Sequence, residues 1–293
     1  MSDAEKWTIG RLLTWTSEYL ADQGSDSPRL EAEILLGHVL GYERINLYVN
    51  IHDEPSDDQK ARFRGLIKQR AAGAPVAYLV EEKEFYSIPL RVTPAVLIPR
   101  PETELLVLAA IDFARARQDS SPLELCDVGT GSGAVSIAIA KNVDDCRVTA
   151  VDISPDALAV AKFNVAKHGL EDRIELVKSD VMESIASERT FDLIVSNPPY
   201  VTEAEMKELP VDVGGYEPHT ALSGGEDGLD VIRRLISQSE KRLRSGGELL
   251  FELSPMIHDA AICLFEGNDA WRVEPTMKDD ARLNRIVRVV RNG

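Results

Sequence analysis

The chain of 293 residues is poor in the side chains on which metal sites and disulfide frameworks depend. It has three cysteines, Cys126, Cys146 and Cys263, without a CxxC pair, and its five histidines are scattered. An odd number of widely spaced cysteines favours reduced thiols over a disulfide scaffold or a zinc site. Because metal sites need clustered ligands, we expect no metal cofactor.

Long hydrophobic runs are also missing. No stretch reaches the roughly 18 apolar residues that cross a bilayer, and the start MSDAEKWTIGRLL has no basic segment followed by an apolar core. These patterns predict neither a membrane span nor a signal peptide. We therefore expect a cytoplasmic protein.

Positive charge is scarce. The chain has 33 Lys and Arg against 49 Asp and Glu, a net charge of -16 and a pI near 4.8. Affinity for DNA and RNA comes mainly from Lys and Arg that neutralise phosphates, so the composition disfavours tight, phosphate-driven nucleic-acid binding. Solubility alone also explains the acidity.

The sequence changes in character near residue 85. Before it, apolar residues at helical spacing, with Ser27 and Pro28 at one start and Gly24 and Gly73 at two ends, predict a small helical domain. The stretch KEFYSIPLRVT then predicts a hairpin turning at Ser87 to Pro89. The predicted parts are a helical substrate-recognition domain over 1–83, a hairpin linker over 84–96 and a second domain over 97–293.

From Leu123 onward, short apolar runs alternate with helical patterns. The runs are LELCDVG, RVTAVDI, RIELVKSD, FDLIVSNPP and GELLFEL. Such alternation indicates right-handed crossovers and a parallel sheet covered on both faces, hence an α/β fold. The final runs WRVEPT and RIVRVVR are predicted to be two further strands that pair. Ligands on such sheets bind beyond the carboxyl ends of the strands.

Three features fall at those strand ends. The first run ends in DVGTGSG, where Gly129, Gly131 and Gly133 allow a tight turn into a helix that starts near Ala134. Asp152 ends the second run, where a carboxylate can accept hydrogen bonds from ribose hydroxyls, and Asp180 ends the third. Each alone fits a plain turn, a helix cap or a solvated charge. Together they favour a nucleoside-containing cofactor.

The fourth run ends in SNPPY. The carboxamide oxygen of Asn197 can accept one N–H of a planar NH2 group and the carbonyl of Pro198 the other, while Tyr200 stacks on the group. Pro199 adds rigidity to the loop. Because the lone pair of an amide nitrogen is delocalised, holding both hydrogens directs it toward an electrophile by positioning and electrostatics.

This ordered set of motifs resembles the class I S-adenosylmethionine-dependent methyltransferases that act on planar nitrogen. Within them the chain is similar to the peptide chain release factor glutamine N5-methyltransferases, the HemK or PrmC family. Further matches are LIPRPETELLV (97–107), PVAYLVEEKEFY (75–86) and YEPHTALSGGEDGLD (216–230). Val181, Val80, Ser87 and Ser254 depart from the family pattern, which commonly has an aromatic residue at the first position and glycine at the others.

The resemblance implies an enzyme that transfers a methyl group from S-adenosylmethionine to the side-chain amide nitrogen (N5) of the glutamine in the GGQ motif of class I release factors. It implies a seven-stranded, mostly parallel Rossmann-like sheet with a small N-terminal helical domain that helps to grip the release factor. We expect direct in-line displacement with S-adenosylhomocysteine as the product. We also expect a monomer that binds neither membrane nor, stably, nucleic acid.

The resemblance also assigns roles to residues. Those implied to bind the cofactor are Gly129, Thr130, Gly131, Ser132 and Gly133 at its methionine part, Asp152 and Ile153 at the ribose, Asp180 and Val181 at the adenine, Arg100, Glu102 and Thr103 as a lid, and Asn197. Those implied to bind the substrate are Asn197, Pro198, Pro199, Tyr200 and Glu217. Asn197, Pro198 and Tyr200 are the implied catalytic residues.

Three other functions fit parts of the pattern. An adenine-N6 or guanine-N2 nucleic-acid methyltransferase also suits NPPY, although the acidity of the chain disfavours it. A nicotinamide-dependent oxidoreductase would explain Gly129, Gly131 and Asp152 but not the NPPY loop. A non-catalytic adaptor would not need a complete NPPY motif.

Overall fold

The computed structural model describes residues 6–117 and 121–293. The chain divides into two compact units. One unit extends to Glu81 and includes Val211–Tyr216, and the other consists of Glu82–Pro210 and Glu217–Gly293.

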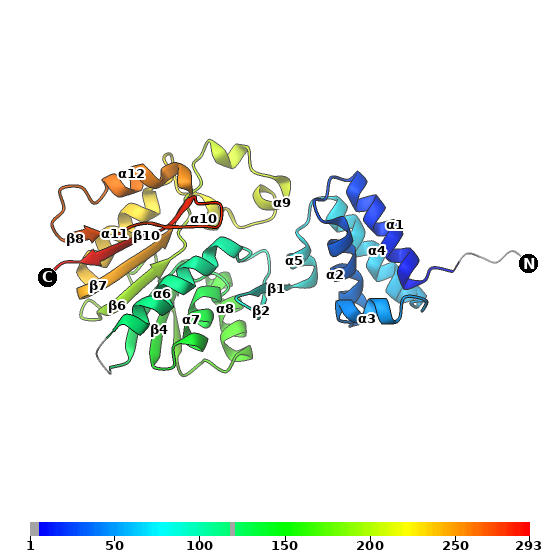
Figure 1. Cartoon of the computed structure of the whole chain (residues 1–293), viewed down its shortest axis with the longest axis horizontal. Helices are drawn as coiled ribbons and strands as arrows, with labels where there is room; N and C mark the ends of the chain where they lie inside the picture. The colour runs from blue at the N-terminus through cyan, green and yellow to red at the C-terminus, as the bar shows by residue number, and fades with distance from the viewer. Residues whose placement is uncertain (1–5, 118–120) are drawn as a thin grey trace, which may run out of the picture. The chain divides into compact units, whose positions relative to one another are not determined.

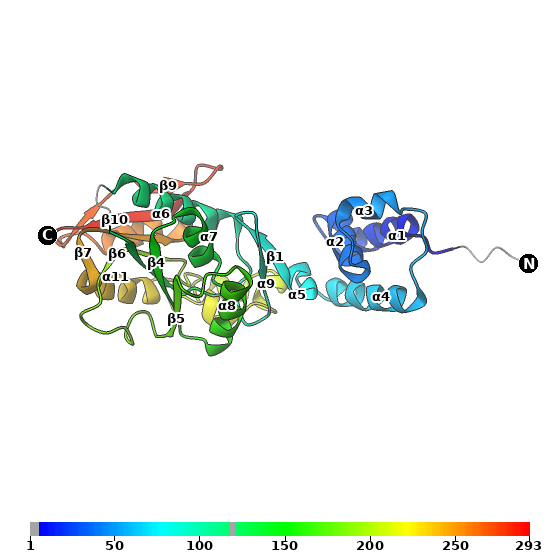
Figure 2. The same ribbon diagram turned by 90° about the horizontal axis from the view of Figure 1, so that it is seen from below.

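The first unit is helical, and Figure 2 shows its main helices grouped together. Its helices are α1 (Ile9–Asp22), α2 (Pro28–Leu40), α3 (Arg44–Val49), α4 (Asp57–Ala71), α5 (Val76–Val80) and α9 (Val211–Gly214). The helices predicted at α1, α2 and α4 are confirmed, whereas the short α3, α5 and α9 were not expected. Ser56 and Gln59 form a capping box at the start of α4, and Gly41 ends α2 in the left-handed conformation. Leu13, Leu35 and Leu47 are fully buried in its core.

The segment Val211–Tyr216 joins this unit from far along the chain. The Tyr216 hydroxyl donates to the Ala72 carbonyl at 3.2 Å. Gly73 has φ +102, and a Cβ there would lie 2.9 Å from Val211 Cγ1. Glycine therefore permits both the backbone conformation at the end of α4 and the close approach of this segment.

A hairpin begins the second unit. β1 (Glu82–Phe85) pairs antiparallel with β2 (Ile88–Arg91), so the predicted hairpin is confirmed. Its turn lies at Tyr86 and Ser87, however, and not at Ser87 to Pro89, because Pro89 is already paired with Glu84. Both turn residues have left-handed φ values, 52° and 57°, which suit a tight two-residue hairpin turn.

One sheet organises the rest of the second unit (Figure 1). Its strands are β3 (Leu123–Val128), β4 (Cys146–Asp152), β5 (Ile174–Lys178), β6 (Phe191–Ser196), β7 (Leu243–Glu252), β8 (Trp271–Val273), β9 (Met277–Lys278) and β10 (Asn284–Arg291). The order is β5-β4-β3-β6-β7-β10-β8, and β9 pairs with β10. The strands from β5 to β7 are parallel, and β10 is antiparallel to β7 and β8. The predicted mostly parallel α/β sheet and the pairing of the last two predicted strands are confirmed. The sheet has eight strands where seven were predicted, because the two-residue β9 also pairs with β10.

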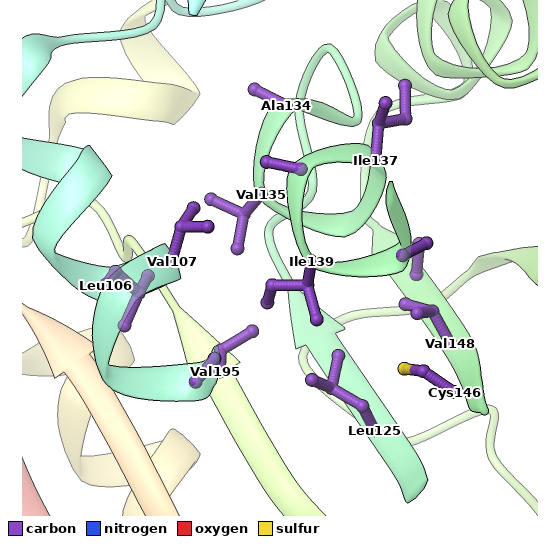
Figure 3. Close-up of a cluster of buried hydrophobic side chains, with 14 of the residues drawn as sticks. Leu106, Val107, Leu125, Ala134, Val135, Ile137, Ile139, Cys146, Val148 and Val195 are labelled. Atoms are coloured by element: carbon purple, nitrogen blue, oxygen red, sulfur yellow. The ribbon is translucent and has the colours of Figure 1, made fainter. Parts of the chain in front are cut away.

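Helices cover both faces of this sheet. The helices α6 (Glu104–Ala116), α7 (Ala134–Asn142) and α8 (Pro155–Lys167) pack on one face, and α11 (Asp230–Arg242) and α12 (His258–Cys263) on the other. Figure 3 shows side chains of α6 and α7 meeting Leu125 and Val195 of the sheet. The short α10 (His219–Leu222) and three 3-10 turns, Pro101–Thr103, Glu205–Lys207 and Pro255–Ile257, complete the unit. No helix among the described residues is long and apolar enough to span a bilayer.

The order of the strands determines where a ligand site can form on the sheet. The chain runs outward from β3 through β4 to β5 and then returns to β6 on the other side of β3. Such a reversal leaves a crevice at the carboxyl ends of the central strands, because the crossovers on its two sides run in opposite directions. The sequence motifs end at β3, β4, β5 and β6, and they therefore converge on this crevice.

Candidate active site

A cavity of about 380 Å³ lies at the carboxyl ends of the central strands. Most residues that the sequence assigned to the site line it, namely Arg100, Thr103, Gly129, Thr130, Gly131, Ser132, Asp152, Ile153, Asp180, Val181, Asn197, Pro198 and Pro199. Four others, Glu102, Gly133, Tyr200 and Glu217, lie outside this lining. The lining also contains His219, Thr220 and Ala221 of α10, which sequence reasoning did not single out.

The glycine loop between β3 and α7 forms one wall of the cavity. Gly129, Gly131 and Gly133 have φ values of 75°, 54° and 81°, a region that glycine adopts without strain. The backbone N–H groups of Gly129 and Thr130 donate to the Val151 carbonyl at 2.9 and 3.0 Å, which holds the loop against β4. The predicted turn and helix start are thus confirmed, and the N-terminus of α7 follows the loop directly.

Asp127 braces this loop from beneath. Its carboxylate is 1% exposed, and its Oδ2 accepts hydrogen bonds from Thr130 Oγ1 at 2.7 Å and Ser136 Oγ at 2.6 Å. Burial raises the pKa of Asp127 to about 6, although the two hydroxyls oppose the shift. Sequence reasoning missed this residue. The available signal was an acidic residue inside an apolar strand.

Asp152 projects from the end of β4 into the cavity. Its Oδ2 accepts from the Gly131 N–H and its Oδ1 from the Ser154 N–H, both at 2.9 Å. A carboxylate oxygen has two lone pairs, so each oxygen can still accept from a ligand hydroxyl. Burial raises the pKa of Asp152 above its ordinary value, and these backbone hydrogen bonds offset only part of the rise. The neighbouring Ile153 lines the cavity with a side chain that is 52% exposed, which offers an apolar surface to a ligand.

The turn after β5 also lines the cavity. Asp180 Oδ2 accepts from Arg234 Nη1 at 2.6 Å, and Arg234 of α11, which the sequence did not point to, also lines the cavity. Val181 has φ 52°, a strained conformation for a β-branched residue. The turn is held because Gln238 Oε1 of α11 accepts from the Met182 N–H at 2.8 Å.

Asn197 follows β6 at the cavity and contacts Thr103, which also lines the cavity. Its Nδ2 donates to Thr103 Oγ1 at 3.1 Å, and among the described residues no group donates to its Oδ1. The carboxamide therefore presents an acceptor oxygen at the end of β6. The preceding Ser196 anchors the strand end by donating to the Val128 carbonyl at 2.7 Å.

Tyr200 lies on the other side of the NPPY loop. It lines a second cavity of about 270 Å³, together with Val201, Glu205, Glu208, Leu209 and Ser254. Its hydroxyl donates to Glu252 Oε1 at 3.3 Å. Burial, together with the adjacent Glu252 carboxylate, raises the pKa of Tyr200, so the phenol stays protonated. Sequence reasoning missed Glu252, which is 1% exposed at the end of β7.

Arg100 and Glu217, which the sequence named separately, form one ion pair. Arg100 Nη2 donates to Glu217 Oε1 at 2.6 Å, and the Glu217 side chain is 1% exposed. The pair joins the PRPET segment to the YEP segment beside the cavity. Arg100 lines the cavity, whereas Glu217 binds Arg100 from outside the lining.

The donor set of the cavity fits S-adenosylmethionine. A carboxylate at the end of the second strand suits ribose hydroxyls, and a glycine loop at a helix N-terminus lets a ligand approach the backbone closely. A cavity of about 380 Å³ is large enough for a small-molecule ligand. Among residues 6–117 and 121–293, no group of three or more His, Cys, Asp or Glu could hold a metal ion. The fold and this site together define a class I methyltransferase.

Comparisons with known proteins identify the family. A family model described as "PrmC N-terminal domain" matches residues 11–80, and one described as "Methyltransferase small domain" matches residues 113–211. The release factor glutamine methyltransferase of Rhodopirellula baltica is 47% identical over 98% of this chain and 97% of its own length. That of Escherichia coli is 41% identical over 81% of this chain and 84% of its own. The chain belongs to the release factor glutamine methyltransferase family, as the sequence motifs predicted.

A solved structure supports the fold. The hMettl16 catalytic domain, in complex with MAT2A 3'UTR hairpin 6, aligns with a TM-score of 0.54 and 17% identity over 78% of this chain and 81% of that chain. At this identity the likeness concerns the fold alone. The curated relatives do not favour the nucleic-acid alternative, and S-adenosylmethionine is the methyl donor of the class.

Proposed function

We propose that this protein transfers a methyl group from S-adenosylmethionine to the N5 side-chain amide of the GGQ glutamine in class I peptide chain release factors. The observation that carries the proposal is the Asn197 carboxamide, held by Thr103 so that its oxygen is available beside the cofactor cavity. Its relatives, which are named release factor glutamine methyltransferases, support the choice of substrate.

Different residues of the cavity bind different parts of the cofactor. Asp152 accepts from the ribose hydroxyls with the lone pairs that Gly131 and Ser154 leave open. The glycine loop holds the methionine part against the N-terminus of α7. Ile153 and Val181 offer apolar contacts to the nucleoside, and Asp180, oriented by Arg234, accepts from the adenine amino group.

The substrate amide is held by hydrogen-bond acceptors. Asn197 Oδ1 accepts one N–H of the glutamine amide, and the Pro198 carbonyl accepts the other. Proline donates no N–H, so Pro198 and Pro199 offer only acceptors to the amide. Both acceptors bind more strongly as the nitrogen gains positive charge in the transition state, and they therefore stabilise that state more than the ground state.

The reaction is a single displacement. When bound, S-adenosylmethionine supplies an electrophilic methyl group on a cationic sulfonium. The amide nitrogen forms the new N–C bond as the C–S bond breaks, and the bond pair stays on sulfur. One amide proton is lost to solvent. The protein contributes position and hydrogen-bond acceptors, because Tyr200 is partly buried, stays protonated and lies outside the lining of the cofactor cavity.

The helical unit is proposed to grip the release factor. It carries exposed large apolar side chains, among them Ile45 at 64% and Val49 at 74% exposure on α3, which suit contact with a protein partner. The same proposal divides the chain into domains over 1–83, 84–96 and 97–293. It also places the protein in the cytoplasm, where release factors act.

Mass spectrometry tests the proposed function. A class I release factor incubated with the protein and S-adenosylmethionine should gain one methyl group, localised to the GGQ glutamine. A release factor with glutamate at that position is the matched control and should gain none. An unmodified wild-type release factor, with S-adenosylhomocysteine shown to bind the protein by calorimetry, would overturn the choice of substrate.

A further inference from the structure

Asn164 is a fully buried polar residue inside α8. It is 0% exposed, and its neighbours on the buried side of the helix are apolar, among them Ala161 and Val165. Asparagine suits a helix interior less well than alanine or leucine, and burying a carboxamide is costly unless its polar atoms are paired. The place of Asn164 in the core is therefore explained by the hydrogen bonds that it makes.

The Asn164 carboxamide binds two separate segments of the second unit. Its Oδ1 accepts from the Arg91 N–H at 2.7 Å, and its Nδ2 donates to the Arg91 carbonyl at 2.9 Å. Its Nδ2 also donates to the Ser132 carbonyl at 2.8 Å. Both amide hydrogens and the amide oxygen are thus used. A flipped carboxamide would place its NH2 group against the Arg91 N–H, so the partners fix the orientation of the side chain.

One of the two segments is the end of the hairpin. Arg91 is the last residue of β2, and Asn164 binds both its N–H and its C=O, as a neighbouring strand would. A few residues further on, Ala95, Val96 and Leu97 line the cavity. Asn164 therefore holds the point from which the chain enters the lining.

The other segment is the glycine loop. Asn164 binds the Ser132 carbonyl, and the N–H of the same peptide group, that of Gly133, donates to the Thr130 carbonyl at 2.8 Å. Because a peptide group is planar, these two hydrogen bonds fix its orientation. Gly131 and Gly133 restrict the backbone little, so an untethered loop would adopt other conformations as well. Asn164 thus restrains a segment that is flexible by composition.

We propose that Asn164 is a positioning residue that preorganises the cofactor cavity by holding the glycine loop and the end of the hairpin in one arrangement. The inference rests on the proposed function in one respect, the assignment of the glycine loop to S-adenosylmethionine. A loop that spends less time in its binding conformation binds the cofactor more weakly in proportion. Asn164 acts through the loop, because it does not itself line the cavity.

Asn164→Leu and Asn164→Asp test the proposal. Both side chains are close to asparagine in size, and neither leucine nor ionised aspartate can donate to Ser132. We expect the Kd for S-adenosylhomocysteine, measured by calorimetry, and the KM for S-adenosylmethionine to rise at least about 10-fold. At saturating cofactor kcat should fall less than about 3-fold, because the bound cofactor orders the loop. An unchanged Kd would overturn the role, since a purely structural asparagine would affect only the unfolding free energy.

The hairpin has further contacts with α8 that do not involve Asn164. His168 Nε2 lies 3.1 Å from the Pro89 carbonyl oxygen, and the Arg91 guanidinium lies 5.0 Å from the centre of the Phe163 ring. The variants should therefore keep the hairpin on α8 and fold. Urea denaturation measures the stability of each variant, so that Kd is compared between folded proteins.

Asn268→Leu is the matched control. The Asn268 carboxamide also has partners on both sides, since it accepts from the Ala270 N–H at 3.0 Å and donates to Glu240 Oε2 at 3.2 Å. None of these three residues lines the cavity. The control should lower the unfolding free energy but leave the Kd for S-adenosylhomocysteine within about 2-fold of the wild type. An equal loss of affinity in the Asn164 and Asn268 variants would reject a specific role for Asn164.

A measurement on the wild type does not depend on the folding of any variant. In protein labelled with 15N-asparagine, S-adenosylhomocysteine should slow the exchange of the Asn164 NH2 hydrogens with solvent at least about 3-fold more than that of the Asn268 NH2 hydrogens. The reason is reciprocity, because a residue that favours ligand binding is itself stabilised by the ligand. An equal effect at both asparagines would reject the link between Asn164 and the cofactor.

These measurements need no release factor, so the inference and the proposed function can fail separately. The expected changes in Kd and exchange, in a protein that leaves release factor unmethylated, would keep the role of Asn164 and reject the substrate. Normal methylation by the wild type, with an unchanged Kd in both Asn164 variants, would keep the proposed function and reject the role of Asn164.

Discussion

Asp127→Asn should change how stability depends on pH. Asp127 is 1% exposed under the glycine loop, and burial raises its pKa from 3.8 to about 6. Both hydroxyl donors, Thr130 and Ser136, bind the same oxygen, Oδ2. An asparagine can keep that acceptor and place its NH2 at the other position. The substitution therefore removes the titration while it preserves the main hydrogen bonds.

The direction in which the unfolding free energy changes with pH follows from the raised pKa of Asp127. Between pH 4 and 6 the folded protein keeps the Asp127 proton that the unfolded chain has lost. The stabilisation from this group is complete below pH 3.8 and is lost as pH rises through about 6. A difference of about two pKa units, at about 1.4 kcal/mol each, corresponds to about 3 kcal/mol. Relative to wild type, the asparagine variant should therefore gain up to about 3 kcal/mol as the pH rises from 4 to 7.

Urea denaturation at several pH values between 4 and 7 measures this difference. The relevant quantity is the unfolding free energy of Asp127→Asn minus that of the wild type, because other acidic groups then cancel. The exposed Asp144→Asn variant controls for the loss of a negative charge alone. A difference that stays constant with pH, or that falls as pH rises, would refute the assignment of Asp127 as a buried titrating group.

Three further substitutions test the site. Asn197→Ala should lower turnover at least about 100-fold and leave the Kd for S-adenosylhomocysteine nearly unchanged, because a transition-state acceptor is lost; turnover near that of the wild type would remove its proposed role. Asp152→Ala should weaken S-adenosylhomocysteine binding about 10-fold or more, because it removes the proposed ribose acceptor and frees the Gly131 N–H. Calorimetry measures this loss, and an unchanged Kd would exclude the ribose assignment. Arg100→Gln should lower the unfolding free energy by about 3 kcal/mol, because it strips the guanidinium from the buried Glu217 carboxylate. Urea denaturation would show this, and a transition at the wild-type midpoint would mean that Glu217 is satisfied by other groups.

The features that could be predicted from sequence are those fixed by local pattern. Apolar runs placed β3, β4, β5, β6 and β7, because strands buried on both faces need nearly continuous apolar residues. Parallel strands end at one edge, so the glycine loop, Asp152 and Asn197 had to converge once the strands were known. The hairpin followed from its alternation, but its turn did not, because Pro89 tolerates an edge-strand position opposite Glu84.

The features that could not be predicted are pairings across long stretches of chain. Arg234 reaches Asp180 from α11, and Glu252 reaches Tyr200 from β7, and in neither case does the local sequence mark the partner. The association of Val211–Tyr216 with the helical unit is of the same kind. Such contacts depend on how the elements pack in space. The family resemblance supplied Arg100 and Glu217, but only the structure shows that they bind each other.

At two positions where the sequence departs from the pattern of the family it resembles, the backbone is in a conformation that favours glycine. Ser87 stands where glycine is common, and Val181 where an aromatic residue is common, yet both residues have left-handed φ values, 57° and 52°. For a residue with a Cβ this conformation costs roughly 1–2 kcal/mol, so the surroundings must impose it. The pairing of Phe85 with Ile88 closes the hairpin around Ser87, and the hydrogen bond from Met182 to Gln238 holds the turn at Val181. The backbone at these positions is therefore set by its neighbours. Substitution of the side chain changes the strain and the surface offered to the cavity, whereas Asp180 still lines the cavity.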